Sequence, residues 1–416
     1  MPVEVRGTDR PGEMPSLLER PVAPPPRAAA PGSGRVLVAT FVTLGLAYGF
    51  WYSYAVFLVA FLREFGWSRS VVAGAFSLLV MVHGLSGPVL GVGLLLGAHV
   101  TAVWQLYLTI GVLAALGISA AGWVPSVVLI RGWFPRSVGT AIGVASAGIG
   151  VGIFALVPFA QLLIEWFGWR WALRVLAVMA AAWIVPATLL LVRAAGHTAP
   201  PATAPSTGGG PPSSRPYWTL RKVVRTWRFW ATGTVFFAGS GATQMLLVHQ
   251  VAYLVDHEVP PFVGATVVGV VGACSVAGKA GWGTLSDRIG REPTYTLAFL
   301  CVAASVGVLA LAGAYPRTPL PYLYAVLIGV GYAVTAPLTP AIASDLFGGP
   351  RFARIFGTLH FTNSLGGALG AWVAGRIFDV TTSYALALPI AAVLALLAPA
   401  LLWFVAPRRP NPAPAS

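Results

Sequence analysis

Long runs of apolar residues, separated by short polar segments, dominate the chain. A run of about 18 or more apolar residues is typical of a helix that crosses the hydrocarbon core of a membrane. Glycine and proline are abundant inside these runs, and membrane helices tolerate both residues better than soluble helices do. We expect eleven spanning helices, at residues 36–62, 71–96, 102–130, 138–164, 172–192, 229–255, 262–285, 293–314, 321–343, 355–375 and 383–406.

Composition supports the same class of protein. Of the 416 residues, 57% are hydrophobic and only 9% are charged, which excludes a soluble domain of this size. The two cysteines, Cys274 and Cys301, both fall inside predicted spans, so a disulfide framework is not expected. The sequence therefore predicts an all-α polytopic membrane protein.

Two tails and one linker interrupt the apolar pattern. Residues 1–34 are rich in proline and arginine and predict a disordered tail, and residues 407–416 form a short second tail. Residues 194–226 contain HTAPPATAPSTGGGPPSSRP, whose composition predicts a flexible linker. The linker divides the chain into an N-terminal helical bundle at 35–193 and a C-terminal bundle of six helices at 227–406.

Similar stretches recur on the two sides of the linker in the same order. WQLYLTIGVLAALG at 104–117 resembles PYLYAVLIGVGYAV at 321–334. GWFPRSVGTAIGVASAGIGVG at 132–152 resembles DLFGGPRFARIFGTLHFTNSLGGALG at 345–370. Two halves related by such a parallel repeat are an architecture of membrane transporters.

The net charge of +14 is spread in a way that indicates orientation. Arginines gather in the N-terminal tail, the linker, the segment SDRIGR and the C-terminal tail, whereas the loop at 256–260 carries only Asp256 and Glu258. By the positive-inside rule, we expect the linker and the C-terminus to be cytoplasmic. We expect a multi-pass protein of the inner cell membrane. This explanation leaves no need for a nucleic-acid partner.

Four motifs carry a resemblance to a known family. They are WYSYAVFLVAFLREFGWSRS at 51–70, WFPRSVGTAIGVASAGIGVG at 133–152, GTLSDRIGR at 283–291 and RIFDVTTSY at 376–384. On these motifs the chain resembles the major facilitator superfamily and, within it, the oxalate/formate antiporter and monocarboxylate transporter group. The resemblance implies two bundles of six helices, alternating access and a small organic anion, most simply a monocarboxylate, as the substrate.

One helix of that pattern is missing from the first half. The distance in sequence from Gly91 to Phe134 is shorter by about 20 residues than the matching distance from Gly283 to Phe347, which is the length of one spanning helix. The first half also lacks the D-R-x-G-R loop. Either residues 71–100 form one merged or distorted helix, or the N-terminal tail lies outside the cell, or the gene product is truncated.

Lys279 is the strongest candidate for chemistry. It is one of only two lysines, the other being Lys222 in the linker, and it lies inside an apolar run about 12 Å from Asp287 along a helix. A charge at this depth costs about 2.5–3.5 kcal/mol to insert and is expected to be functional. In the resembled group this position carries the cation that binds the substrate carboxylate. The alternative is packing, with the ammonium partly reaching toward the lipid headgroups.

Other polar residues inside the spans are weaker candidates for the substrate site. Packing or an interfacial position is the competing interpretation for each of them. Where the resembled antiporters place a second cation, this chain has Asn363, so a monocarboxylate is favoured over a dicarboxylate. The candidates are His360, Asn363, Tyr52, Tyr54, His249 and Gln250, with Trp51, Gln244 and His83 behind them.

The remaining expectations concern coupling, partners and excluded chemistry. Asp287, Arg288 and Arg291 are expected to form a charge motif that controls movement rather than a substrate site. No metal-ligand cluster, nucleophile motif or phosphate-binding loop is visible in the sequence, so we expect neither an enzyme nor a metal, cofactor or ATP requirement. The expected partners are a small organic anion, the lipid bilayer and a coupling proton or counter-anion, and the protein is expected to be a monomer. A non-transporting or degenerate membrane protein such as a sensor, and a carrier of a different small solute, are the alternatives.

Overall fold

Helices make up nearly all of the described chain. The computed structural model describes residues 33–82, 94–116, 138–198, 218–348 and 352–405, with the single positions 118, 126, 130 and 133. In the first half the helices are α1 (Ser33–Phe65), α2 (Arg69–Val82), α4 (Val103–Leu106) continuing as the π-helix η1 (Tyr107–Ala114), and α7 (Val138–Thr198). In the second half they are α8 (Leu220–Val223), α9 (Trp227–Asp256), α10 (Pro261–Ile289), α11 (Arg291–Ala314), α12 (Leu320–Tyr332), α13 (Thr335–Phe347), α14 (Phe352–Thr381) and α15 (Ala387–Val405).

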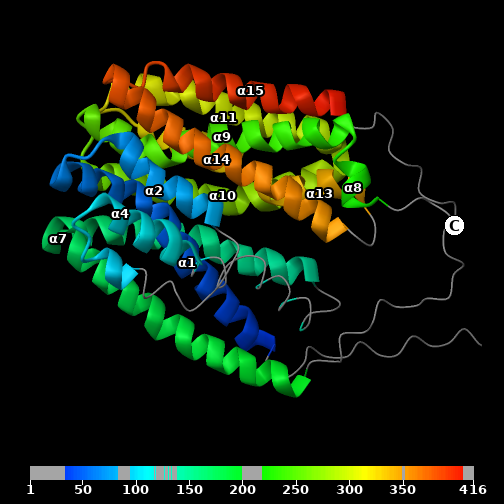
Figure 1. Cartoon of the computed structure of the whole chain (residues 1–416), viewed down its shortest axis with the longest axis horizontal. Coiled ribbons are helices and arrows are strands. Elements are labelled where there is room, and N and C mark those ends of the chain that lie inside the picture. Colours follow the sequence, from blue (N-terminus) through cyan, green and yellow to red (C-terminus); the bar gives the residue numbers. More distant parts are fainter. Residues whose placement is uncertain are drawn as a thin grey trace, which may run out of the picture.

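The predicted spans correspond to these helices. Within the described residues, six helical stretches are long and apolar enough to cross a membrane, and α9 and α14 are 30 residues long each. The predicted spans 138–164 and 172–192 are the two arms of α7, which turns back where Gly168 adopts a φ of 78° (Figure 1). The predicted span 321–343 is divided between α12 and α13. The merged helix expected over residues 71–100 falls largely on 83–93, outside the described residues.

In each half, closely packed glycines bring two helices together. In the first half, Gly45 of α1 lies against Gly148 and Gly152 of α7, and an added Cβ at Gly152 would overlap the backbone of Gly45. In the second half, Gly241 of α9 lies against Gly370 of α14 in the same way, and an added Cβ at Gly370 would come within 2.8 Å of the Gly241 Cα. Small residues let helix backbones approach closely inside a membrane. Because Gly148, Gly152 and Gly370 fall within the stretches that recur in sequence, the repeat is also visible in the packing.

This packing predicts a contrast between two glycines of α7. Gly152→Ala should lower the stability by about 1–3 kcal/mol, because the methyl group would overlap the backbone of α1. Gly143→Ala is the matched control, since an added Cβ there meets nothing within 4 Å and alanine favours a helix. Thermal unfolding of both variants in detergent measures the difference. Equal melting temperatures would show that the α1–α7 contact is looser than described.

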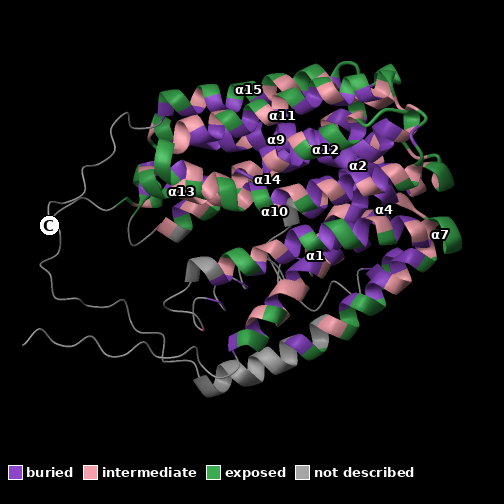
Figure 2. Cartoon of the chain, turned by 180° about the vertical axis from the view of Figure 1, so that it is seen from behind, coloured by how far each residue is buried: buried purple, intermediate pink, exposed green. Residues whose placement is uncertain are grey.

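The halves lie against each other at one end of the bundle. We call this end, which holds the turns at 66–68, 257–260 and 382–386, the latch end, and the opposite end, where α7 stops and α8 begins, the linker end. Toward the linker end, α1 and α7 diverge from α13 and α14 (Figure 1). Buried residues concentrate on α1, α9 and the inner sides of α2 and α10, whereas α15 is exposed along much of its length (Figure 2).

Candidate functional site

A seam between α10 and α7 joins the two halves and positions Lys279. Gly272 of α10 meets Ile153 of α7, and Val276 meets Gly150. Lys279 follows Gly272 by two helical turns and therefore points within about 20° of the same direction, toward the first half. A neighbouring side of α10, about 60–100° around the helix from Lys279, is occupied, because Gly278 packs on Ala333 and the Trp282 indole donates to the Val330 carbonyl at 2.7 Å.

The Lys279 ammonium has no counter-charge among the residues that the structure describes. The residue is half-buried about 15 Å from the linker end of α10, and no hydrogen bond or ion pair to a described residue involves it. Nearby polar groups of α10 form hydrogen bonds within the helix. The Ser275 hydroxyl, for example, donates to the Gly272 carbonyl at 2.8 Å. An unpaired cation at this depth is costly unless a ligand supplies the anion.

A layer of polar side chains lies one turn farther from the linker end. Tyr52 of α1 contacts Tyr332 of α12, with ring centroids 6.2 Å apart, so this pair bridges the halves. Along their helices Tyr52, Tyr332 and fully buried Ser275 all lie about 18–21 Å from the latch end. Gln244 of α9 has the same depth, and its buried Oε1 accepts no hydrogen bond from any described residue.

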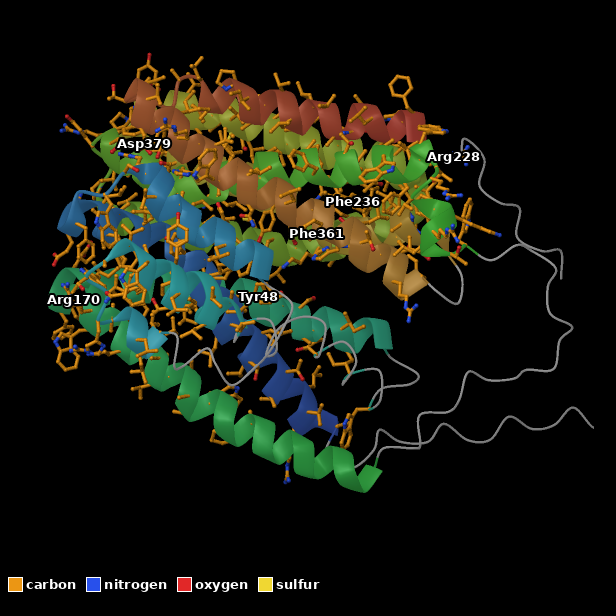
Figure 3. All side chains as sticks on the ribbon, viewed as in Figure 1. Tyr48, Arg170, Arg228, Phe236, Phe361 and Asp379 are labelled. Atoms are coloured by element: carbon orange, nitrogen blue, oxygen red, sulfur yellow. The ribbon has the colours of Figure 1, made fainter. Side chains whose placement is uncertain are left out.

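No hydrogen bond or ion pair joins the two candidates on α14 to Lys279 among the described residues. His360 packs against Phe356 with ring centroids 5.8 Å apart, and Asn363 is half-buried. Figure 3 shows the neighbouring Phe361 midway along α14. In the first half, α2 is described only as far as Val82, and His83 lies outside the described residues.

A cluster of polar groups closes the latch end, and we name it the latch: Arg69, Asp256, Asp379 and Tyr384. Arg69, the first residue of α2, donates to Asp256 of α9 at 2.7 Å and to the Tyr384 hydroxyl at 2.7 Å. Its guanidinium also lies 3.6 Å from the Phe378 ring centroid. With only 12% of the Arg69 side chain exposed, these contacts join the first half to three elements of the second half.

Asp379 of α14 holds the start of α2. Its two carboxylate oxygens accept from the backbone amides of Arg69 at 2.6 Å and Ser70 at 2.8 Å (Asp379 is labelled in Figure 3). A carboxylate at a helix N-terminus satisfies unpaired amides and the positive end of the helix dipole. Farther along the same face, the Ser77 hydroxyl donates to the Ala368 carbonyl at 2.6 Å.

His249 connects the latch to the interior of the second half. Its Nδ1 lies 2.9 Å from the Tyr384 hydroxyl and its Nε2 lies 2.9 Å from the Ala371 carbonyl oxygen. Burial raises the pKa of Tyr384, in the turn before α15, so its hydroxyl keeps its proton.

The two other candidates at this end bond to the backbone. Tyr54 of α1 donates to the Val72 carbonyl at 2.6 Å and so joins α1 to α2. The Gln250 amide donates to the Leu247 carbonyl at 2.9 Å, while its buried Oε1 accepts no hydrogen bond among the described residues.

The charge motif at the linker end includes a residue that the sequence analysis did not assign to it. Arg291 donates to Asp287 at 2.9 Å and to Asp345 of α13 at 3.2 Å, so it ties α10 and α11 to α13. Arg288 is exposed and forms no ion pair with a described residue.

Asp345→Asn should lower the melting temperature only slightly, because exposed ion pairs contribute about 0–1 kcal/mol. A thermal unfolding scan checks this, and a large drop would show that Asp345 is structurally essential.

Sequence reasoning also missed the latch, although the signal was present. Arg69 lies in the motif WYSYAVFLVAFLREFGWSRS, and Asp379 and Tyr384 lie in RIFDVTTSY. Both stretches carried the family resemblance, but nothing in one sequence shows that they meet.

A cavity of about 800 Å³ lies in the second half, between α9, α11 and α15 at the latch end. Small apolar residues such as Ala303, Gly307 and Ala310 line one part of it, and Tyr253, Asp256 and Tyr384 line another, so the cavity borders the latch. In the part of the chain that the structure describes, no group of three or more His, Cys, Asp or Glu residues is placed to hold a metal ion.

Comparison with known proteins identifies relatives over most of the chain. The family model described as Major Facilitator Superfamily matches residues 84–335 and 282–416. Monocarboxylate transporter 13 of Bos taurus is 25% identical over 396 residues, covering 89% of each chain. Monocarboxylate transporter 3 of Rattus norvegicus is 27% identical over 394 residues, covering 86% of this chain and 78% of the relative.

Solved structures share the fold. A bacterial homologue of the human lysosomal transporter Spinster, in an inward-facing and occupied conformation, aligns with a TM-score of 0.64 at 13% identity, covering 91% of this chain and 97% of that one. A peptide transporter POT mutant aligns with a TM-score of 0.65 at 13% identity, covering 89% and 95%.

Proposed function

The chain belongs to the Major Facilitator Superfamily, and from that premise we propose that it moves a small monocarboxylate across the membrane by alternating access. A multi-pass membrane protein of this family is a transporter, so the open question is which solute it carries. The names of the relatives, monocarboxylate transporters 13 and 3, support the substrate class.

The observation that carries the proposal is the unpaired ammonium of Lys279. It lies on the seam between the halves, on the side of α10 that faces α7, and substrate sites of such carriers lie at the interface of the repeats. A carboxylate bound there would supply the missing counter-charge with a charge-assisted hydrogen bond. One cation matches one carboxylate, which favours a monocarboxylate over a dicarboxylate.

The neighbouring polar groups would complete the site. Tyr52 and Ser275 offer hydroxyl groups close to the same depth, and Gln244 offers an amide. His360 and Asn363 would line the α14 side, whereas Tyr54 and Gln250 would act by holding helices near the latch. The coupling partner would be a proton or a counter-anion.

The distribution of basic residues indicates how the protein would be oriented in the membrane. The linker end carries Arg221, Lys222, Arg225 and Arg228, which would make it cytoplasmic (Arg228 is labelled in Figure 3). The latch end would then be the outer end, and the described arrangement, shut at the latch and divergent at the linker end, would be inward-facing.

A substrate panel tests the proposal. Cells that express the protein should accumulate labelled lactate or acetate faster than cells with an empty vector, and a neutral solute such as glycerol should not be accumulated faster. Oxalate should be carried more slowly than lactate, because a second carboxylate would lack a cation. Uptake that is equal to the vector control for every carboxylate would contradict the proposal.

A further inference from the structure

We propose that His249 is a proton-binding site that governs the latch: the neutral imidazole completes the shut latch, and a proton taken up there from the outer side opens it. The proposal depends on the proposed function in one respect only: it takes from it that the two halves of a carrier separate at the latch end.

The hydrogen bonds determine which form of His249 fits the shut latch. The Ala371 carbonyl can only accept, so Nε2 carries a hydrogen. In the neutral ring Nδ1 is then an acceptor, and the Tyr384 hydroxyl donates to it. The same hydroxyl accepts from Arg69, so every group in this chain of hydrogen bonds has a matching partner.

A second proton on the ring breaks this match. Nδ1 becomes a donor, so the Tyr384 hydroxyl faces two donors and its own hydrogen loses its acceptor. Two cations then flank one hydroxyl, since the ring nitrogen and the Arg69 nitrogen lie 2.9 Å and 2.7 Å from it. Both effects weaken the contact between Arg69 and the second half.

The other groups around His249 compensate for that charge only in part. The Asp379 carboxylate attracts it, but this residue is offset from Ala371, the contact of the ring, by about 12 Å along α14 and is already bonded to the start of α2, and the Arg69 charge opposes it. Asp256 is offset from His249 by about 10 Å along α9 and is already bonded to Arg69. Tyr253, on the same helix, contacts the Tyr384 ring but has no charge to offer. Leu309 of α11 and Leu388 of α15 close the remaining side and are apolar.

Distance measurements on the full chain in lipid nanodiscs test the proposal without any substrate. Spin labels on Thr101→Cys and Ala385→Cys, with Cys274 and Cys301 replaced by serine, report the separation of the halves at the latch end. One linked proton changes the ratio of open to shut latch by up to about tenfold per pH unit, so the open fraction should rise at least about threefold between about pH 7.5 and pH 5.5.

Three variants make the test specific. His249→Gln should abolish the pH response, because the amide stays neutral. Tyr384→Phe should raise the open fraction already at pH 7.5 and flatten the response. His257→Gln is the matched control and should respond like the parent: this residue caps the C-terminus of α9, and among the described residues its ring hydrogen-bonds only to the Tyr253 carbonyl. A pH-independent parent, or a full response in His249→Gln, would overturn the proposal, whereas absence of carboxylate uptake would overturn only the proposed function.

Discussion

Lys279→Met should lower the rate of lactate uptake by at least about 30-fold, while the protein remains folded in the membrane. Loss of one partner from a buried charge pair costs about 2–5 kcal/mol, which corresponds to a factor of this size or larger. The methionine side chain fills a similar volume, so the packing of α10 against α7 should persist. The empty carrier should be as stable as the parent or more stable, since the cost of burying an unpaired ammonium disappears.

Two comparison variants test whether the effect comes from the charge at position 279 and not from the loss of any lysine. Lys222→Met removes the only other lysine, which is exposed on α8, and should transport like the parent. Lys279→Arg should retain part of the activity, because a planar guanidinium keeps the charge but not the compact shape of an ammonium. Uptake is measured in vesicles with membrane abundance in parallel. Full activity of Lys279→Met would show that the lysine serves packing alone.

Asp379→Ala should shift the protein toward the form that is open at the latch end. The substitution leaves the amides of Arg69 and Ser70 without their acceptor and removes an anion from the positive end of α2. Hydrogen bonds to a charged group contribute about 1.5–3 kcal/mol, so the ratio of open to shut molecules should rise about 10- to 150-fold. The spin-label pair at Thr101 and Ala385 measures this ratio at neutral pH.

Glu64→Ala is the matched control for that experiment. Glu64 pairs with Arg170 at 2.8 Å at the same end of the bundle, but both residues belong to the first half and both are exposed (Arg170 is labelled in Figure 3). Its loss should leave the distance distribution unchanged, because exposed pairs contribute little. If the two variants behave alike, the latch is not what holds the halves together.

Most of the fold could be predicted from apolar run length alone. The described helices α1, α9, α10 and α11 begin and end within a few residues of the predicted spans, because length and hydropathy determine where a chain can cross a membrane. The division of 321–343 into α12 and α13 was not predicted, although Pro337 accounts for it: proline has no amide hydrogen to bond to the carbonyl four residues earlier, which is that of Ala333 at the break.

Lys279 could be recognised from sequence because a lone charge in an apolar run is conspicuous. The latch could not, because Arg69, Asp379 and Tyr384 lie at the ends of spans, where charged and aromatic residues are ordinary. Only the tertiary structure shows that segments about 300 residues apart in sequence, such as Arg69 and Asp379, meet there. The same applies to His249, whose partners Tyr384 and Ala371 come from the far end of the chain.

Counterflow of lactate through the purified, reconstituted protein tests the central claim most directly. Vesicles loaded with unlabelled lactate should take up labelled lactate transiently above equilibrium, a result that requires a carrier alternating between two sides and needs no coupling ion. The overshoot should be absent from protein-free vesicles and from vesicles with Lys279→Met. Labelled lactate that enters parent and protein-free vesicles alike would contradict the assignment of a monocarboxylate carrier built around Lys279.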